Sequence, residues 1–357
     1  MSEHQLNIQL ANRVKNISGG QNRNVIIKTM KQTRDIQFEY VRVIATLWIV
    51  GVWHMPSYVK TDFSMEIMGW SLGHVTTCML ATFMFMSGYF LSKYRFEDKT
   101  EILSFYRKRL TRFFPLFAIA ALLLYRLGFN PGKLQLLLTV TGLSSYFGHQ
   151  SYTIWFISML FSFYMVTPVI AKGLEKIRYG VVVKSLLVVV FSIVFIYALS
   201  CTSLDYDVRL SYTMPFYGLG LIFGREPIVK NLTSKWYVLV ISAMTLILLH
   251  NFHIVGERYL HVDTVTAIVL FLSVCYWLRN LPMSRIILML SYASMAVYLF
   301  HRPIFHLSDK YILDTDKCEL TEFYIILMPI MIFLSYVIQL SYDFSIKMLS
   351  KKEKLKK

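Results

Sequence analysis

Long apolar runs recur along the whole chain, and they constrain its fold more than any other feature of the sequence. Of the 357 residues, 55% are hydrophobic and only 16% are charged. A soluble domain of this length would leave much of that apolar surface in water, whereas a bilayer would bury it. We therefore predict an all-α polytopic membrane helix bundle. Ten runs are long enough to cross a membrane, and they lie near 38–58, 69–92, 112–129, 152–171, 181–200, 209–224, 236–252, 262–278, 286–305 and 322–344.

The basic residues indicate how these runs are oriented. The formal net charge is +16, which nucleic-acid-binding proteins also show. Here, however, Lys and Arg lie in short loops between apolar runs, so no nucleic-acid partner is expected. With the N-terminus in the cytoplasm, 27 of the 37 Lys and Arg fall on cytoplasmic segments and eight on outer segments. Cytoplasmic loops of membrane proteins carry such an excess, and it favours ten crossings with both termini inside.

The polar ends of the chain enclose one membrane domain. We expect a cytoplasmic N-terminal tail over 1–35, a membrane domain over 36–345 and a basic cytoplasmic tail over 346–357. The first 35 residues lack the apolar core of a cleavable signal peptide. The sequence does not define an oligomeric state.

The first apolar run, FEYVRVIATLWIVGVWHM, contains the ionisable residues Glu39, Arg42 and His54. An ionisable side chain at membrane depth is costly and calls for a partner or a function. Glu39 and Arg42 are three residues apart, so they can pair on one helix face, either as an anchor or as part of a site. His54 has two interpretations. It is an interfacial residue that bonds to another helix, or it is a general base that takes a proton from a hydroxyl.

Several segments, taken in order, resemble the acyltransferase family 3 membrane proteins, which are bacterial O-acyltransferases of cell-surface glycans. The first run resembles the opening helix of that family, with an acidic residue, then Arg, then His. Five later segments resemble further family elements: TFMFMSGYFLSKY at 82–94, YRKRLTRFFPLF at 106–117, YTIWFISMLFSFYMVTP at 152–168, YTMPFYGLGLIFGRE at 212–226 and SYASMAVYLFHRPI at 291–304. The resemblance covers roughly 36–344. Another large class of membrane-bound acyltransferases with an intramembrane His matches this order less well.

The resemblance implies a donor and an acceptor. The donor would be cytoplasmic acyl-CoA, most simply acetyl-CoA, and the acceptor a hydroxyl of a surface polysaccharide or lipid-linked glycan. His54 would act as the general base or carry the acyl group transiently, and both routes stay open. Arg42, supported by Glu39, would orient the donor.

A cluster of basic residues precedes the third apolar run, and Arg107, Arg109 and Arg112 belong to it. As ordinary loop residues these arginines would anchor the chain on the cytoplasmic side. As a site, their paired N–H donors would bind the phosphates of coenzyme A. We predict the acyl-CoA site at these three residues. No metal is predicted, because the nine histidines are scattered and form no HExxH motif.

The predicted acceptor-binding residues are His301 and Tyr89. His301 lies at the outer end of the ninth run and matches the late His of the family, although with Arg302 it would also serve as an interfacial anchor. Tyr89 follows Ser87 and Gly88, which we interpret as a close helix-packing site rather than a nucleophile.

The spacing in the first run differs from the family motif by one residue. Eleven residues separate Arg42 from His54, where the motif has ten. At about 100° per residue, this spacing turns His54 roughly 120° away from Arg42 in a straight helix, against about 20° for the motif. Either the two side chains need not face the same way, or a π-bulge absorbs the extra residue, with Gly51 as the weak point.

Together these features predict an O-acetyltransferase of the bacterial inner membrane, in contact with membrane lipids, acyl-CoA and a glycan. The alternative is a transporter or export component for glycan or a small solute, without catalysis. Ten spans and buried ionisable groups suit a transporter equally well. Dependence on acyl-CoA distinguishes the two.

Overall fold

Helices dominate the fold. The computed structural model describes residues 36–59, 66–67, 70–129, 132–147, 152–202, 204–251, 260–281, 284–311 and 319–355. The longer helices are α3 (Ile36–Leu47), α4 (Leu72–Leu91), α5 (Lys99–Arg126), α6 (Lys133–Thr141), α7 (Trp155–Lys176), α8 (Val181–Ser200), α9 (Leu210–Phe223), α11 (Trp236–Asn251), α12 (Leu260–Leu278), α13 (Arg285–Tyr311) and α15 (Met328–Leu355). Short turns of helix are η1 (Trp48–Trp53), η2 (Met55–Ser57), η3 (Ser144–Tyr146), η4 (Tyr152–Ile154), α10 (Ile228–Thr233), α14 (Leu320–Glu322) and η5 (Phe323–Leu327). A small antiparallel hairpin joins β1 (Glu66–Ile67) to β2 (Trp70–Ser71).

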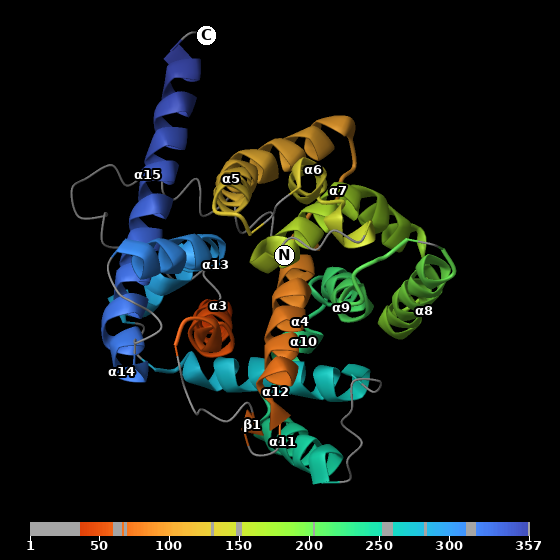
Figure 1. The fold of residues 1–357 in the computed structure, drawn as a ribbon. Helices are drawn as coiled ribbons and strands as arrows, with labels where there is room; N and C mark the ends of the chain where they lie inside the picture. Colours follow the sequence, from red (N-terminus) through yellow and green to blue (C-terminus); the bar gives the residue numbers. More distant parts are fainter. Residues whose placement is uncertain are drawn as a thin grey trace, which may run out of the picture.

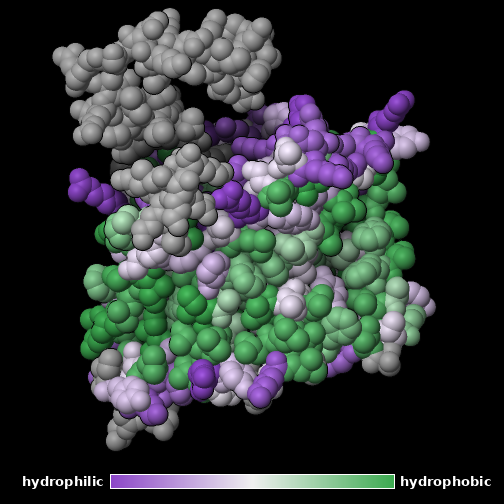
Figure 2. Space-filling model, turned by 90° about the horizontal axis from the view of Figure 1, so that it is seen from above, coloured by the Kyte–Doolittle hydropathy of each residue, from purple (hydrophilic) through white to green (hydrophobic). Residues whose placement is uncertain are grey.

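Each of the ten predicted apolar runs coincides with a helix of the structure. Among the described residues, five helical segments are long and apolar enough to cross a membrane: Ile36–Ser57, Leu72–Leu91, Tyr152–Lys176, Val181–Ser200 and Leu320–Met348. Figure 2 shows a broad apolar band between two polar rims, as expected of a membrane protein. The number of crossings and the side of each terminus stay predictions. The predicted tail at 1–35 lies outside the described residues, and the predicted tail at 346–357 continues α15 as helix to Leu355.

Two helices from the N-terminal part of the chain lie at the centre of the bundle. In Figure 1, α3 and α4 have α13 and α15 on one side and α7, α8 and α9 on the other, with α12 crossing beside them. The buried face of α3 packs against α12 and α13. In contrast, α8 is apolar all round and only Ser192 among its residues is buried. A helix of that composition is stable with its sides against lipid.

The tightest helix contact joins α4 and α9 through glycines. A Cβ atom added to Gly88 would lie 2.1 Å from the carbonyl oxygen of Tyr217, and one added to Gly220 would lie 2.1 Å from that of Phe85. Both obstacles are backbone atoms, so they cannot move aside as a flexible side chain would. The interpretation of Ser87–Gly88 as a helix-packing site is therefore confirmed for Gly88.

Alanine at either glycine is expected to destabilise the bundle. Gly88→Ala or Gly220→Ala forces α4 and α9 apart, and such overpacking costs about 1–3 kcal/mol. Gly173→Ala is the control, because a Cβ at Gly173 meets no atom within 4 Å. Thermal denaturation of the solubilised protein, followed by fluorescence, would show a lower melting temperature for the first two variants alone. Equal melting temperatures for all three would contradict the packing role.

Candidate functional site

The first membrane helix changes its winding before it reaches His54. After α3 ends at Leu47, residues Trp48–Trp53 form the π-helix η1, and the backbone N–H of His54 donates to the carbonyl of Ile49 at 3.1 Å. This bond spans five residues instead of four, so the wider turn absorbs one extra residue. The predicted bulge is confirmed, and Gly51 lies within it. The Tyr324 hydroxyl, from the second π-helical segment η5, donates to the Gly51 carbonyl at 2.8 Å.

The bulge places His54 directly against His301 of α13. Nδ1 of His54 lies 2.8 Å from Nε2 of His301, and the two rings are stacked with centroids 4.8 Å apart. Both side chains are buried, and His301 is 0% exposed. The pair joins residues 247 positions apart in the chain. Sequence reasoning singled out both histidines but did not pair them.

The hydrogen bonds around this pair determine its tautomers. Nδ1 of His301 lies 2.8 Å from the carbonyl oxygen of Tyr298. A carbonyl only accepts, so this nitrogen carries the hydrogen, and in the neutral ring Nε2 of His301 is an acceptor. Nδ1 of His54 must then be the donor between the rings. Nε2 of His54 is left with a free lone pair, which is the group that a general base or a nucleophile needs.

His54 faces a cavity of about 390 Å³. The cavity is lined by Trp53, His54, Pro56, Ser57, Tyr152, Thr153, Trp155, Arg209 and Arg302. We call it the His54 cavity. Arg302, for which an interfacial anchor was one interpretation of the sequence, lines this cavity, and so does Arg209, which the sequence did not single out. Helix α13 continues to Tyr311, so Arg302 lies within the helix rather than at its end.

His301 does not line the His54 cavity, and its predicted role in binding the acceptor stays a prediction. It lies behind His54, where it holds that imidazole in one orientation. The predicted role of Tyr89 at the acceptor likewise stays a prediction. It lies near the far end of α4, and its ring packs against Phe38 with centroids 5.0 Å apart. The structure therefore does not bring Tyr89 to His301.

The other end of the first helix holds the predicted ion pair. The Arg42 guanidinium lies 3.2 Å from a carboxylate oxygen of Glu39, and the second Glu39 oxygen accepts a hydrogen bond from Ser291 of α13. Arg42 also lies over the ring of Phe90, 5.4 Å from its centroid. Its side chain lines a second cavity of about 210 Å³, which we call the Arg42 cavity. Glu39 thus fixes Arg42 at the cavity wall.

Of the three predicted donor-site arginines, the structure brings only Arg109 to Arg42. Arg109 lines the Arg42 cavity, and its guanidinium lies 5.6 Å from the ring centroid of Tyr164. Arg107 and Arg112 are exposed and line neither cavity. At about 100° per residue, Arg107 points almost opposite to Arg109 on the same helix.

Other basic residues gather beside Arg109. Lys93, Arg95 and Lys108 line a surface cavity of about 540 Å³ together with Tyr94, Thr100, Glu101 and Ser104. We call it the Lys93 cavity. Tyr94 links it to the Arg42 cavity, since the Arg109 guanidinium lies 6.0 Å from the Tyr94 ring centroid. Sequence reasoning did not assign Lys93 and Arg95, although they lie in the same basic segment, between the second and third apolar runs, as the predicted arginines.

Two contacts fix the shape of this loop. Arg225 donates to the carbonyl oxygens of Ser92 and Tyr94 at 2.8 and 3.1 Å, which flank Lys93. Asp98 caps α5 by accepting from the backbone N–H of Glu101 at 2.7 Å, and this bond lowers the pKa of the Asp98 carboxyl.

A thin layer of side chains separates the Arg42 cavity from the His54 cavity. Tyr298 lines the Arg42 cavity, and its hydroxyl donates to the carbonyl of Thr153 in the wall of the His54 cavity at 2.9 Å. Its ring packs against Phe156, with centroids 5.8 Å apart, and against His301, with centroids 6.0 Å apart. The two cavities therefore approach each other from opposite ends of the first helix, with Tyr298 between them.

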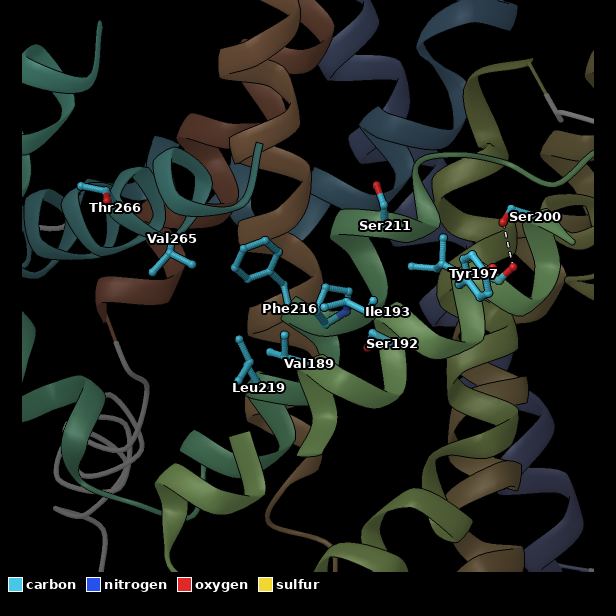
Figure 3. A pocket seen from close by; sticks show the side chains of 12 residues that line it. Val189, Ser192, Ile193, Tyr197, Ser200, Ser211, Phe216, Leu219, Val265 and Thr266 are labelled. Atoms are coloured by element: carbon cyan, nitrogen blue, oxygen red, sulfur yellow. Dashed lines mark hydrogen bonds between the residues drawn. The ribbon is translucent and has the colours of Figure 1, made fainter. Parts of the chain in front are cut away.

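A further cavity, of about 740 Å³, lies between α8, α9 and α12 (Figure 3). Its described lining is apolar apart from hydroxyl groups such as Ser192, Ser211 and Thr266, and includes no acidic, basic or imidazole side chain. It does not supply the groups that acid–base chemistry requires. Among the described residues, no cluster of three or more His, Cys, Asp or Glu side chains is placed to hold a metal ion.

These observations define a helical membrane protein with a buried imidazole pair between two arginine-lined cavities. Residues 35–340 match the family model Acyl_transf_3, described as an acyltransferase domain. The match covers most of the chain, so the chain belongs to acyltransferase family 3 and is a membrane acyltransferase. Comparison with curated proteins and with solved structures gives no match.

Proposed function

We propose that the chain transfers an acyl group, most simply acetyl, from cytoplasmic acyl-CoA to a hydroxyl of a surface polysaccharide or lipid-linked glycan at the bacterial inner membrane. The observation that carries this proposal is the lone pair on Nε2 of His54. It is held by the bond to His301, and His54 lines a cavity in a chain that belongs to an acyltransferase family.

The three cavities suggest how the donor binds. The Arg42 cavity, at about 210 Å³, is smaller than the 300–1,000 Å³ typical of sites for drug-sized ligands, so it suits the narrow pantetheine arm. The Lys93 cavity is wider and basic, which suits the nucleotide and its phosphates. Arg109 lies between the two and would bind phosphate oxygens where the arm begins.

The reaction needs one base at the acceptor. In the direct route, Nε2 of His54 takes the hydroxyl proton while the acceptor oxygen attacks the thioester carbon. The C–S bond then breaks, and the imidazolium returns the proton to the CoA sulfur. In the covalent route, Nε2 itself attacks the thioester carbon, the C–S bond breaks and CoA leaves as the thiolate. The acceptor oxygen then attacks the acyl carbon, the bond to Nε2 breaks, and the hydroxyl proton ends on the CoA sulfur. Both routes use the same lone pair, and in both the thioester has to pass Tyr298.

A transporter is the alternative function, because cavities that approach each other from opposite ends of the bundle also suit alternating access. The two functions differ in their need for acyl-CoA. Membranes that contain the chain, radiolabelled acetyl-CoA and unacylated glycan should yield labelled glycan. If the glycan stays unlabelled with every short-chain acyl-CoA tried, the enzyme proposal is wrong.

Within that assay, Arg109 and Arg112 should behave differently. A hydrogen bond to a charged group contributes about 1.5–3 kcal/mol, so Arg109→Gln should raise KM for acyl-CoA about 10- to 100-fold. The matched control Arg112→Gln removes the same charge from an exposed position of α5 and should change KM less than about twofold. Equal effects of the two substitutions on KM would indicate that the whole basic segment, rather than Arg109 in particular, binds the donor.

A further inference from the structure

Arg302 is a buried cation in the His54 cavity. Its side chain lines the cavity, although the residue is only 9% exposed. One guanidinium nitrogen donates to the Tyr152 hydroxyl at 3.1 Å, and the rings of Tyr152 and Tyr58 lie 4.5 and 5.3 Å away. Its Nε atom is buried and has no hydrogen-bond partner among the described residues. No described carboxylate forms a salt bridge with it.

Arg209, the second arginine of this cavity, is compensated differently. Its Nε donates to a carboxylate oxygen of Asp207 at 2.7 Å, and its guanidinium lies 3.7 Å from the ring centroid of Trp155. The described part of this site therefore contains two guanidinium groups, of Arg209 and Arg302, and one carboxylate, of Asp207. Among the described side chains, the cavity beside His54 carries more positive than negative charge.

That charge is not balanced by the aromatic rings alone. Arginine stays protonated in proteins, and burying a charge without a counter-ion is costly. A cation over an aromatic ring recovers only part of that cost. An anion in the cavity would offset the remaining cost and would use the Nε donor that Arg302 leaves unpaired.

We propose that the acceptor is anionic and that Arg302 binds its anionic group beside His54. The group is a carboxylate or phosphoryl oxygen, carried by the sugar itself or by the phosphate that links the glycan to a lipid. The donor phosphates do not compete for this position, because the basic Lys93 cavity lies on the far side of Tyr298. Trp53, Tyr152 and Trp155 line the same cavity and make part of its wall aromatic, which suits contact with a sugar. This inference rests on the proposed acyl transfer.

The test compares acceptors that differ only in charge. Unacylated glycan from a host that lacks this chain is used untreated, after carboxyl groups are reduced to alcohols, or after phosphate is removed with aqueous hydrogen fluoride. Each is offered with radiolabelled acetyl-CoA to the wild type, Arg302→Gln, Arg302→Lys and Lys310→Gln. The last is the control, because Lys310 is an exposed cation on the same helix.

The wild type and Lys310→Gln should use the untreated glycan at least tenfold better, in kcat/KM, than one of the treated forms. The treatment that lowers kcat/KM identifies the group as carboxylate or phosphate. Arg302→Gln should lose this preference through a higher KM for untreated glycan alone, and Arg302→Lys should keep part of it. Removal of the phosphate also removes the lipid attached to it. A lower kcat/KM after this treatment therefore supports the proposal only if Arg302→Gln abolishes the difference.

Two outcomes would overturn the inference. The first is that the wild type accepts all three glycans equally. The second is that Arg302→Gln lowers kcat by the same factor with each glycan, which would show that Arg302 stabilises the reacting oxyanion instead. Failure of the wild type to label even untreated glycan would overturn the proposed acyl transfer itself.

Discussion

Replacing His54 by alanine is expected to abolish acylation of the surface glycan while the polymer still reaches the cell surface. Loss of a positioned general base lowers a rate about 10²–10⁴-fold, and in the covalent route no acyl carrier would remain. NMR of purified surface polysaccharide measures the ester directly. Wild type, deletion and His54→Ala should be compared at matched membrane levels.

The control for this substitution is His306→Ala. His306 lies on the same helix as His301 and packs edge-on against Phe129, with centroids 5.1 Å apart, but it lines neither the His54 nor the Arg42 cavity. The substitution His306→Ala should leave acylation unchanged. If His54→Ala retains the ester and the polymer is lost or kept inside, the transporter function is correct and His54 serves transport or packing.

Replacing His301 by leucine should lower acylation about 10²-fold, although His301 does not line the His54 cavity. Without its acceptor nitrogen the His54 ring is free to change tautomer, so that Nε2 carries the proton in part of the molecules. His301→Gln should recover much of the activity, because its side-chain oxygen can accept from Nδ1 of His54. The measurement is kcat for label transfer from acetyl-CoA.

This pattern separates positioning from packing. Leucine fills the space of His301 in an apolar core, so a purely structural role predicts that His301→Leu is the milder variant in both kcat and melting temperature. A lower kcat for His301→Leu than for His301→Gln, with KM for acyl-CoA unchanged, supports the role of His301 in fixing the tautomer of His54. The reverse order would contradict it.

The features predicted correctly from the sequence are those that depend on neighbouring residues. The apolar runs predicted the helices, because a backbone in lipid has to satisfy its hydrogen bonds within each segment. The pairing of Glu39 with Arg42 follows from their three-residue separation. The extra residue between Arg42 and His54 indicated the π-bulge. In a regular helix this residue would turn His54 away from the face of Arg42, and a wider turn absorbs it. Gly88 was correctly interpreted for a similar reason, since small residues let helices approach.

The site itself depends on how each helix is rotated and what it meets, and only the tertiary structure decided that. Spacing along α5 could not show that Arg109 turns toward Arg42 while Arg112 stays exposed. The bond between His54 and His301 spans 247 residues, and no local pattern encodes it. The sequence grouped Tyr89 with His301, but it could not show that the Tyr89 ring packs against Phe38 of α3. Local periodicity determined the elements, and long-range packing determined which side chains meet.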